Sequence, residues 1–323
     1  QWMQKRRHRS KANSKRGSRK NIAYHYDLGN AFYKLWLDDS MTYSSALYLT
    51  EEESLQQAQI NKYQRAIDEL DVKDGDRVLE IGCGWGGFAE AAAEQGRDVT
   101  GGTISRNQHG YAESRLDGRA EIQLRDYRDV EGRFDNIVSI EMIEAVGTRY
   151  WPSYFATLKR SLAEGGRVLL QAITVRDDVF ESYRTSSDYI RQYVFPGGML
   201  LSDGVIADQA AKAGLSIRDT FAFGPDYART CQQWANRLTA QKRRIDELGT
   251  REPTILRQGD TRIVVQVPGL QDPEQLKELL GQTAKLEFKL VDQEALPSDV
   301  AEGIAPPGSE IFPFAEGSAF EGT

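Results

Sequence analysis

An acid followed by a glycine-rich turn is the stretch of this sequence best suited to holding a ligand. Gly82, Gly84 and Gly87 have the spacing G-x-G-x-x-G, between a strand-like apolar run and an alanine-rich helical segment. Such a turn lets a ligand approach the backbone N–H groups at a helix N-terminus. Glu80 stands two residues before the first glycine. An acid there suits the sulfonium and amino groups of S-adenosylmethionine, so the spacing favours that cofactor over a dinucleotide.

The residues that follow the turn support the same choice. A dinucleotide site expects an acid about 20 residues further on, to bind the ribose. The sequence has Thr-Gly-Gly-Thr at 100–103 instead, without an acid. Asp126 and Tyr127 offer a carboxylate and an aromatic face that suit adenine. Two alternatives stay open, which are an NAD site and a glycine turn that only packs a helix on a strand.

The elements that must position these residues alternate along the chain. Alternating strands and helices predict a parallel sheet covered on both faces, which is an α/β, Rossmann-like fold. Helices are expected over 55–70, 88–94, 105–116, 151–162, 205–213 and 227–247. Strands are expected over 78–81, up to 103–104, and over 121–124, 134–140, 167–175 and 215–223.

Composition excludes several classes of protein. With 40% hydrophobic and 28% charged residues, the chain is neither disordered throughout nor fibrous. No run reaches the roughly 18–20 apolar residues of a transmembrane helix. The three histidines share no metal-ligand spacing with each other or with the two cysteines, so no metal site is expected. The chain begins at Gln1, with no apolar stretch behind its basic leader, so we expect a fragment without a signal peptide.

Longer stretches carry a family resemblance. They include AYHYDLGNAFYKLWLDDSMTYSSALY (23–48), VLEIGCGWGGFA (78–89), FDNIVSIEMIEAVG (134–147) and YIRQYVFPGGML (189–200). Residues 20–238 resemble the cyclopropane-fatty-acyl-phospholipid synthase family, which includes mycolic acid cyclopropane synthases and fatty-acid methyltransferases. The resemblance implies a Rossmann-like methyltransferase fold. It implies cofactor contacts from Tyr43, Ser44, Gly82, Cys83, Gly84, Thr103, Ile104, Ser105, Gln108, Tyr127 and Arg128.

The resemblance also implies the chemistry. Methyl transfer to a cis double bond of an acyl chain gives a carbocation, and a bicarbonate held by a polar cluster takes its proton. Glu144 and Ile173 match positions of that cluster, while Ser45 replaces its usual cysteine and Gln171 its usual histidine. The replacements look like the subgroup that makes methyl-branched or methylene products, so ring closure stays open.

Simpler interpretations of single residues also stay open. Glu141 or Glu144 could cap the next helix, and Cys83 suits a small packing residue better than a nucleophile. Tyr33, Trp36, Phe195 and Met199 are ordinary core residues in one interpretation and line an acyl-chain tunnel in the other.

The charge at the N-terminus predicts the setting of the protein. Residues 1–20 hold nine Lys or Arg and no acid. No nucleic-acid-binding module accompanies them, so attraction to an anionic lipid surface is the better interpretation, at about 1 kcal/mol per basic residue. The two cysteines are too few for a disulfide scaffold and fit a reducing compartment. We therefore expect a cytoplasmic protein at the inner face of a bacterial membrane, acting on unsaturated phospholipid acyl chains and not on nucleic acid.

The C-terminal part has a different resemblance. Residues 243–291 resemble the first periplasmic segment of the protein-export subunit SecD. We expect a basic leader (1–20), a methyltransferase domain (21–238), a SecD-like βαβ segment (239–291) and an acidic tail rich in Pro and Gly (292–323). Because the two parents lie on opposite sides of a membrane, the join suggests a hybrid reading frame.

A join at this place has consequences for activity. The family should continue with a closing helix that carries the tyrosine of the cluster and with a last antiparallel strand. We expect both to be missing and turnover to be weak or absent, unless residues 262–267 fill the empty strand position. The rival functions are a SecD-derived interaction fragment, a small-molecule methyltransferase and an NAD enzyme.

Overall fold

The computed structural model describes residues 13–15, 17–18, 22, 28–186 and 197–248, and the backbone of 254–258 and 262–266. All of them fall in one compact unit, Gln1–Gly269, while Leu270–Thr323 form a second unit outside the described residues. Several expectations therefore lie outside the described part. These are the structure of residues 1–12, the place of Phe195, residues 267–291 of the SecD-like βαβ segment and the tail over 292–323.

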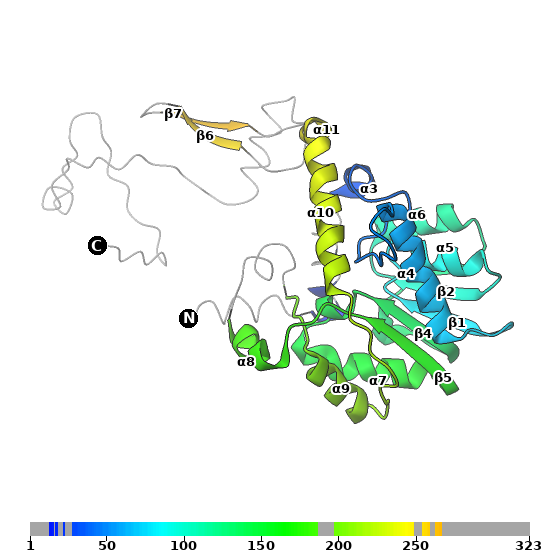
Figure 1. The fold of residues 1–323 in the computed structure, drawn as a ribbon. Helices are drawn as coiled ribbons and strands as arrows, with labels where there is room; N and C mark the ends of the chain where they lie inside the picture. Colours follow the sequence, from blue (N-terminus) through cyan, green and yellow to red (C-terminus); the bar gives the residue numbers. More distant parts are fainter. Residues whose placement is uncertain are drawn as a thin grey trace, which may run out of the picture. The chain divides into compact units, whose positions relative to one another are not determined.

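A five-stranded parallel sheet forms the centre of the fold (Figure 1), with the strand order β3-β2-β1-β4-β5. The order reverses between β1 and β4, and ligands bind at the carboxyl ends of the strands at such a point. The expected α/β, Rossmann-like class is confirmed. The strands are β1 (Arg77–Ile81), β2 (Asp98–Thr103), β3 (Glu121–Leu124), β4 (Phe134–Ile140) and β5 (Leu162–Gln171).

Helices cover both faces of this sheet. On one face, Val78 and Val138 pack against α4 (Leu55–Leu70), α5 (Gly87–Ala93) and α6 (Arg106–Leu116). On the other, Leu79 and Ile137 pack against α7 (Trp151–Ser161) and α9 (Asp203–Lys212), which lie below β4 and β5 in Figure 1. Neighbouring residues of a strand point to opposite faces, so the apolar runs of β1 and β4 supply both layers.

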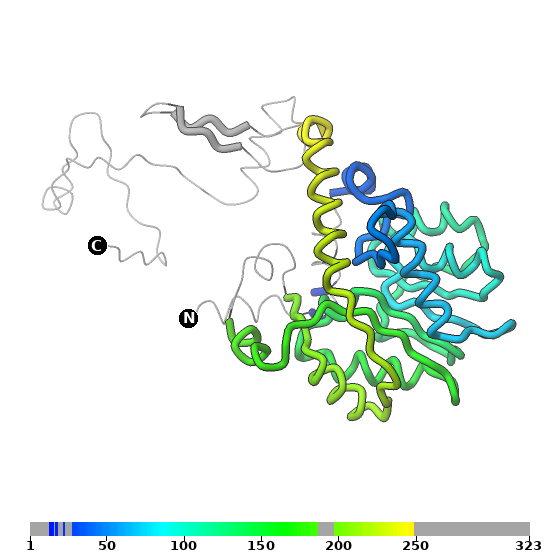
Figure 2. Tube along the Cα trace, in the orientation of Figure 1, coloured from blue at the N-terminus to red at the C-terminus, as the bar shows by residue number. Residues whose placement is uncertain are grey.

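A third cluster joins two segments that lie far apart in the sequence. The aromatic rings of Trp36 and Trp234 lie 5.6 Å apart, and Tyr33 and Trp85 pack in the same cluster. Trp234 belongs to α10 (Gly224–Ala240), which is followed by α11 (Lys242–Glu247), where one helix over 227–247 was expected. Figure 2 traces α10 past the N-terminal segment that holds α3 (Gly29–Tyr33).

Two strand expectations were wrong. Residues 215–223 are not a strand, although their apolar residues suit one. A strand needs a neighbour for its backbone hydrogen bonds, and none of the described strands pairs with this segment. The fifth strand runs over Leu162–Gln171 and not over 167–175, with an isolated bridge between Thr174 and Leu201 beyond it.

The proposed filling of an empty strand position by residues 262–267 is also wrong. β7 (Arg262–Gln266) pairs antiparallel with β6 (Thr254–Gln258) in a separate two-stranded sheet. Only three residues separate the two strands along the chain, and so short a connection favours a hairpin. Among the described helices, none combines the length and the apolar character needed to cross a bilayer.

The remaining helix, α8 (Asp177–Thr185), follows β5 and buries Phe180 against the α7 side of the sheet. Met199 lies in the same cluster, while Tyr33 and Trp36 belong to the third cluster. All three are buried, as a core residue requires, and a role in binding an acyl chain stays a prediction.

Candidate functional site

An open pocket lies where the strand order reverses, at the carboxyl ends of β1 to β4. Its volume is about 820 Å³, including the solvent at its mouth. Nine of the thirteen expected cofactor residues line it, namely Glu80, Gly82, Gly84, Thr103, Ile104, Gln108, Asp126, Tyr127 and Arg128. The other four, Tyr43, Ser44, Cys83 and Ser105, are not among its lining residues.

The glycine turn closes tightly onto the neighbouring strand. The backbone N–H groups of Gly82 and Cys83 both donate to the carbonyl oxygen of Gly102, at 2.9 and 3.0 Å. Gly82 has φ +83°, and a Cβ there would lie 2.7 Å from Cγ of Met142. Glycine is therefore required at position 82 for its backbone conformation and for space.

Cys83 is not placed to act as a nucleophile. The side chain of Cys83 is buried in the apolar layer under α4 to α6. It packs closely against β2, since a Cβ added to Gly101 would lie 3.0 Å from the Cβ of Cys83. Burial raises the pKa of the thiol, which disfavours the reactive thiolate. The structure thus supports the interpretation of Cys83 as a packing residue.

The start of α6 forms the part of the pocket that was predicted to contact the ribose. Ser105 caps this helix, because its Oγ accepts from the backbone N–H of Gln108 at 3.3 Å. The Thr103 hydroxyl donates to Oε1 of Gln108 at 2.9 Å. Ser105 thus acts through the helix that it caps, while Thr103 and Gln108 face the pocket.

An ion pair between an arginine and a carboxylate lines the pocket beside Tyr127. Arg128 donates from Nε and Nη2 to the two oxygens of Asp126, each at 2.7 Å. Burial alone would raise the pKa of Asp126, but the bonds from Arg128 outweigh it and lower that pKa. The guanidinium lies 5.2 Å from the ring centroid of Tyr127. Asp126 was expected to hold adenine, and the structure uses both of its oxygens to fix Arg128 beside the aromatic face.

Part of the N-terminal segment reaches the same end of the pocket, which the sequence did not indicate. Arg128 donates to the carbonyl oxygen of Asn13 at 3.0 Å and to Oγ of Ser18 at 3.3 Å. Ser18 and Ile22 belong to the pocket lining. Lys15 pairs with Asp129. These contacts tie a stretch of the basic leader to the pocket.

Glu80 is a buried acid with an open bonding position in this pocket. Its side chain is 3% exposed, and its Oε2 has no hydrogen-bond partner among the described residues. Burial raises its pKa to about 8. A buried carboxylate oxygen without a donor is costly, and a cationic group in the pocket would satisfy it.

Two carboxylates follow β4 and gather the expected catalytic residues. Glu144 Oε1 accepts from the backbone N–H of Ile173 at 2.5 Å. Glu141 Oε1 accepts from the backbone N–H of Ser45 and from Nε2 of Gln171, both at 2.8 Å. The structure therefore brings the four predicted residues together, but Ser45 and Gln171 bind Glu141, which the sequence analysis had not chosen for the site.

The geometry argues against a capping role for either acid. The helices that follow begin after Met142, Gly147 and Tyr150, and none of the three has a side-chain cap. Glu141 adopts φ +47°, a left-handed conformation that is uncommon for a residue other than glycine. Such strain is typical of functional positions.

Glu144 is poised to be protonated. Burial raises its pKa to about 8, and the negative charge of nearby Glu141 adds to the effect. Its Oε2 has no hydrogen-bond partner in the described part of the chain. The raised pKa favours the protonated form of this carboxyl group at neutral pH.

A tyrosine that was not among the predicted site residues lies near the two carboxyl groups. Tyr227 belongs to α10, and it interacts electrostatically with Glu141, Glu144 and Tyr43, while the absence of the family's closing helix stays a prediction. Burial and the two carboxylates raise the pKa of its phenol, so Tyr227 stays a hydrogen-bond donor. The signal was Gly-Pro-Asp at 224–226, because proline favours the first turn of a helix.

Metal ligands do not gather around this site. Within the part of the chain that the structure describes, no three His, Cys, Asp or Glu side chains lie close enough to hold an ion. The site instead combines buried carboxyl groups with a tyrosine and an amide.

Comparisons with known proteins agree with this geometry. A family model described as mycolic acid cyclopropane synthetase matches residues 13–257. The chain is 40% identical to tuberculostearic acid methyltransferase of Mycobacterium tuberculosis over 72% of its length and 57% of that protein. It is 38% identical to cyclopropane-fatty-acyl-phospholipid synthase of Escherichia coli, over 67% of its length and 56% of that protein. The chain thus spans little more than half of these relatives.

A second family model describes the C-terminal part. The N-terminal region of the P1 domain of protein translocase subunit SecDF matches residues 235–293, which overlaps the first match at 235–257. The expected join therefore falls inside a stretch that both models match. The domain limits themselves stay a prediction.

Solved structures resemble the described fold. A mycolic acid cyclopropane synthase complexed with SAH and CTAB has a TM-score of 0.67 at 29% identity, covering 71% of this chain and 86% of that one. A cyclopropane synthase of Mycobacterium tuberculosis has a TM-score of 0.66 at 28% identity, covering 70% and 85%. The first family model matches well over half of the sequence. The chain belongs to the mycolic acid cyclopropane synthetase family.

Proposed function

We propose that this chain binds S-adenosylmethionine in the pocket at the ends of β1 to β4 and methylates an unsaturated fatty acyl chain at its double bond. One observation carries the proposal. Glu80, with a carboxylate oxygen that lacks a partner among the described residues, shares a pocket with Glu141, and Glu144 interacts electrostatically with Glu141. The buried acids suit a cationic cofactor and a cationic intermediate, and family membership supports the same activity.

The residues of the chain have distinct parts in this proposal. When bound, S-adenosylmethionine supplies an electrophilic methyl group. Burial raises the pKa of Glu80 to about 8, and the positive charge of the cofactor would favour its ionised form, which accepts a hydrogen bond from the cationic end. Tyr127 offers its ring to the adenine. Glu141 lies beside the acyl chain and stabilises the carbocation electrostatically.

The base is best supplied by a separate anion. Glu144 is protonated at neutral pH, since its pKa is about 8, and it is therefore a poor base there. Protonated Glu144 and the Tyr227 phenol are instead donors for a small anion. We propose that bicarbonate binds between them and takes the proton of the carbocation, which leaves a neutral product and carbonic acid.

The product follows from how the carbocation loses its proton. Gln171 stands where the resembling family has histidine, and an amide neither takes nor gives a proton at neutral pH. We propose a methyl-branched or methylene product, with cyclopropane as the alternative. The acyl chain is proposed to belong to a phospholipid at the inner face of a bacterial membrane, approached through the basic leader.

Labelled methyl transfer tests this function. The full chain is incubated with S-adenosylmethionine carrying a labelled methyl group, bicarbonate and vesicles of phospholipid with cis-unsaturated chains. We expect label in the acyl chains, and a product that takes up hydrogen under mild catalytic hydrogenation is a methylene compound and not a cyclopropane. Label in water-soluble molecules alone, or the absence of S-adenosylmethionine binding by calorimetry, would contradict the proposal.

A further inference from the structure

Lys62 is a fully buried cation that no step of the proposed chemistry uses. It lies on α4 and is 4% exposed, and it is the only lysine or arginine below 9% exposure among the described residues. Burying an ammonium group costs several kcal/mol unless charges and hydrogen bonds compensate it. Its position therefore needs an explanation.

Carboxylates surround the Lys62 ammonium from three elements. Asp38 precedes α4, Glu80 belongs to β1, and Glu141 follows β4, and all three interact with it electrostatically. Burial lowers the pKa of Lys62 to about 7 against the pull of these acids. Two of them, Glu80 and Glu141, line the pocket. Lys62 does not line the pocket itself, but it interacts electrostatically with two acids that do.

Within the described part of the chain, the Lys62 ammonium donates a hydrogen bond to a predicted cofactor residue. Its Nζ lies 2.6 Å from Oγ of Ser44. An ammonium group only donates, so the serine oxygen accepts, and the single proton of the Ser44 hydroxyl remains for another acceptor. Gln59, also on α4, donates to the carbonyl oxygen of Ser44 at 2.9 Å. Ser44 is therefore held at two points by one helix.

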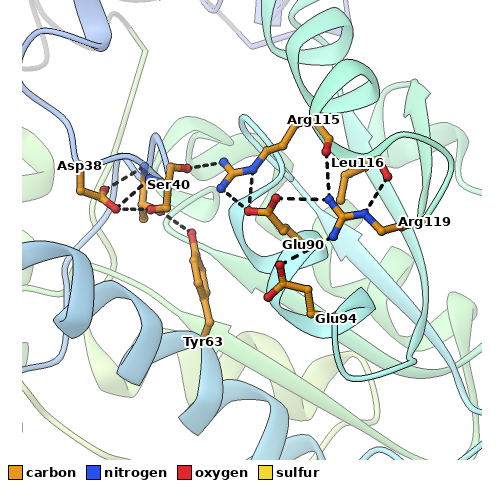
Figure 3. A network of polar contacts seen from close by, with 9 residues as sticks. Asp38, Ser40, Tyr63, Glu90, Glu94, Arg115, Leu116 and Arg119 are labelled. Atoms are coloured by element: carbon orange, nitrogen blue, oxygen red, sulfur yellow. Dashed lines mark hydrogen bonds and ion pairs between the residues drawn. The ribbon is translucent and has the colours of Figure 1, made fainter.

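The segment that carries Ser44 is fixed on both sides. After it, the backbone N–H of Ser45 binds Glu141. Before it, Ser40 binds Asp38 and receives Arg115 at its carbonyl oxygen, at 2.6 Å, and Thr42 lies 2.8 Å from the Tyr63 hydroxyl. Figure 3 shows Ser40 between Asp38 and Arg115, with Glu90 binding both Arg115 and Arg119. Ser44 is not a lining residue itself, and these contacts fix it next to Ser45, which binds the lining residue Glu141.

We propose that Lys62 is a positioning residue for the carboxylate of the methionine part of the cofactor. It fixes Ser44 as a donor and supplies positive charge at a pocket end whose other buried charges are carboxylates. Glu80 and Glu141 then match the sulfonium and amino groups, and the Lys62–Ser44 pair matches the carboxylate. The adenine end lies at Asp126 to Arg128. The inference rests on the proposed function, since it assumes that S-adenosylmethionine occupies this pocket.

Three ligands that differ only at the methionine end test the inference. Calorimetry on the full chain compares S-adenosylmethionine, S-adenosylhomocysteine and methylthioadenosine, which lacks the amino-acid part. For Lys62→Met we expect about tenfold weaker binding of the first two and a less than about twofold change for methylthioadenosine. Ser44→Ala removes the hydroxyl donor that Lys62 is proposed to fix, keeps the lysine, and should give the same pattern. Lys73→Met changes a lysine whose side chain is 67% exposed and should change nothing.

The outcomes separate the possibilities. Equal weakening for all three ligands would mean that Lys62 only supports the fold, and unchanged binding in both variants would exclude any part for it; either result overturns the inference. If Lys62→Met does not fold, Ser44→Ala decides by the same criterion. If the unaltered chain binds methylthioadenosine and S-adenosylmethionine equally, the carboxylate is not recognised and the inference fails alone. If it binds none of the three, the proposed function fails as well.

Discussion

At the scale of single residues, the site contains acids whose pKa values are raised by burial. Glu144 has a pKa of about 8 in the folded chain, against an ordinary value of 4.5. Between these values the folded protein keeps a proton that the unfolded chain has released. Raising the pH from about 4.5 to about 8 therefore lowers the free energy of unfolding through this group.

Glu144→Gln should remove this pH-dependent cost. The amide oxygen still accepts from Ile173, so we expect the variant to be more stable by about 1–3 kcal/mol at about pH 8 and nearly unchanged at about pH 4.5. Methylation should fall by less than about tenfold, because the Nε2–H of the amide replaces the protonated oxygen as a donor for the anion. Urea unfolding at several pH values measures the first effect. A gain in stability that is the same at every pH would contradict the assignment of the raised pKa to Glu144.

Residue patterns predicted the pocket better than the catalytic cluster. Glu80 and the glycines lie within one turn of chain, so their spacing alone indicated a cofactor site. Glu141 became visible only in the fold, because its partners Ser45 and Gln171 are far from it in sequence. The role proposed for Lys62 had no sequence signal either, since a lysine on a helix is normally exposed.

At the scale of elements, α10 is attached to the N-terminal segment mainly by side chains that bind backbone groups. Arg229 donates to the carbonyl oxygens of Thr50, Glu51 and Glu53, at 3.0, 2.5 and 3.1 Å. Arg237 donates to that of Leu37 at 2.9 Å. These contacts hold the helix that carries Tyr227.

Arg229→Ala should loosen this attachment. Three carbonyl groups lose their donor, so we expect a loss of about 1–2 kcal/mol in the free energy of unfolding and a lower turnover, with cofactor affinity nearly unchanged. Arg243→Ala is the matched control, because that side chain is 90% exposed and should change stability by less than about 0.5 kcal/mol. Equal stability of the two variants in urea would show that the contacts of Arg229 contribute nothing.

The elements also mark the limit of sequence-based prediction. Most helices and strands between 55 and 162 match their expected ranges, because apolar periodicity and the caps of α4 and α6 are local signals. The strand predicted over 215–223 was wrong, because a strand depends on its neighbour and not only on its own residues. The placement predicted for residues 262–267 in the main sheet was wrong for the same reason, since their partner is the adjacent strand β6.

At the scale of the whole molecule, the question is what the family part needs from the rest of the chain. The described residues that line the pocket all lie between Ser18 and Val146. The cluster around Glu141 and Glu144 is completed by Gln171, Ile173 and Tyr227. The hydrogen bonds that attach α10 to the N-terminal segment end at Arg237. All these contacts precede residue 249.

A chain that ends at Leu248 should therefore keep the pocket. We expect its affinity for S-adenosylhomocysteine to stay within about threefold of the full chain, because no described contact of the site is removed. Its thermal midpoint should fall by no more than a few degrees, since the three apolar clusters lie within residues 33–238. A chain that ends at Ser202 is the control, because it lacks α10 and with it Trp234 and Tyr227. If the longer truncation loses cofactor binding as completely as the control does, residues beyond 248 contribute to the site, and the SecD-like segment is part of the working domain.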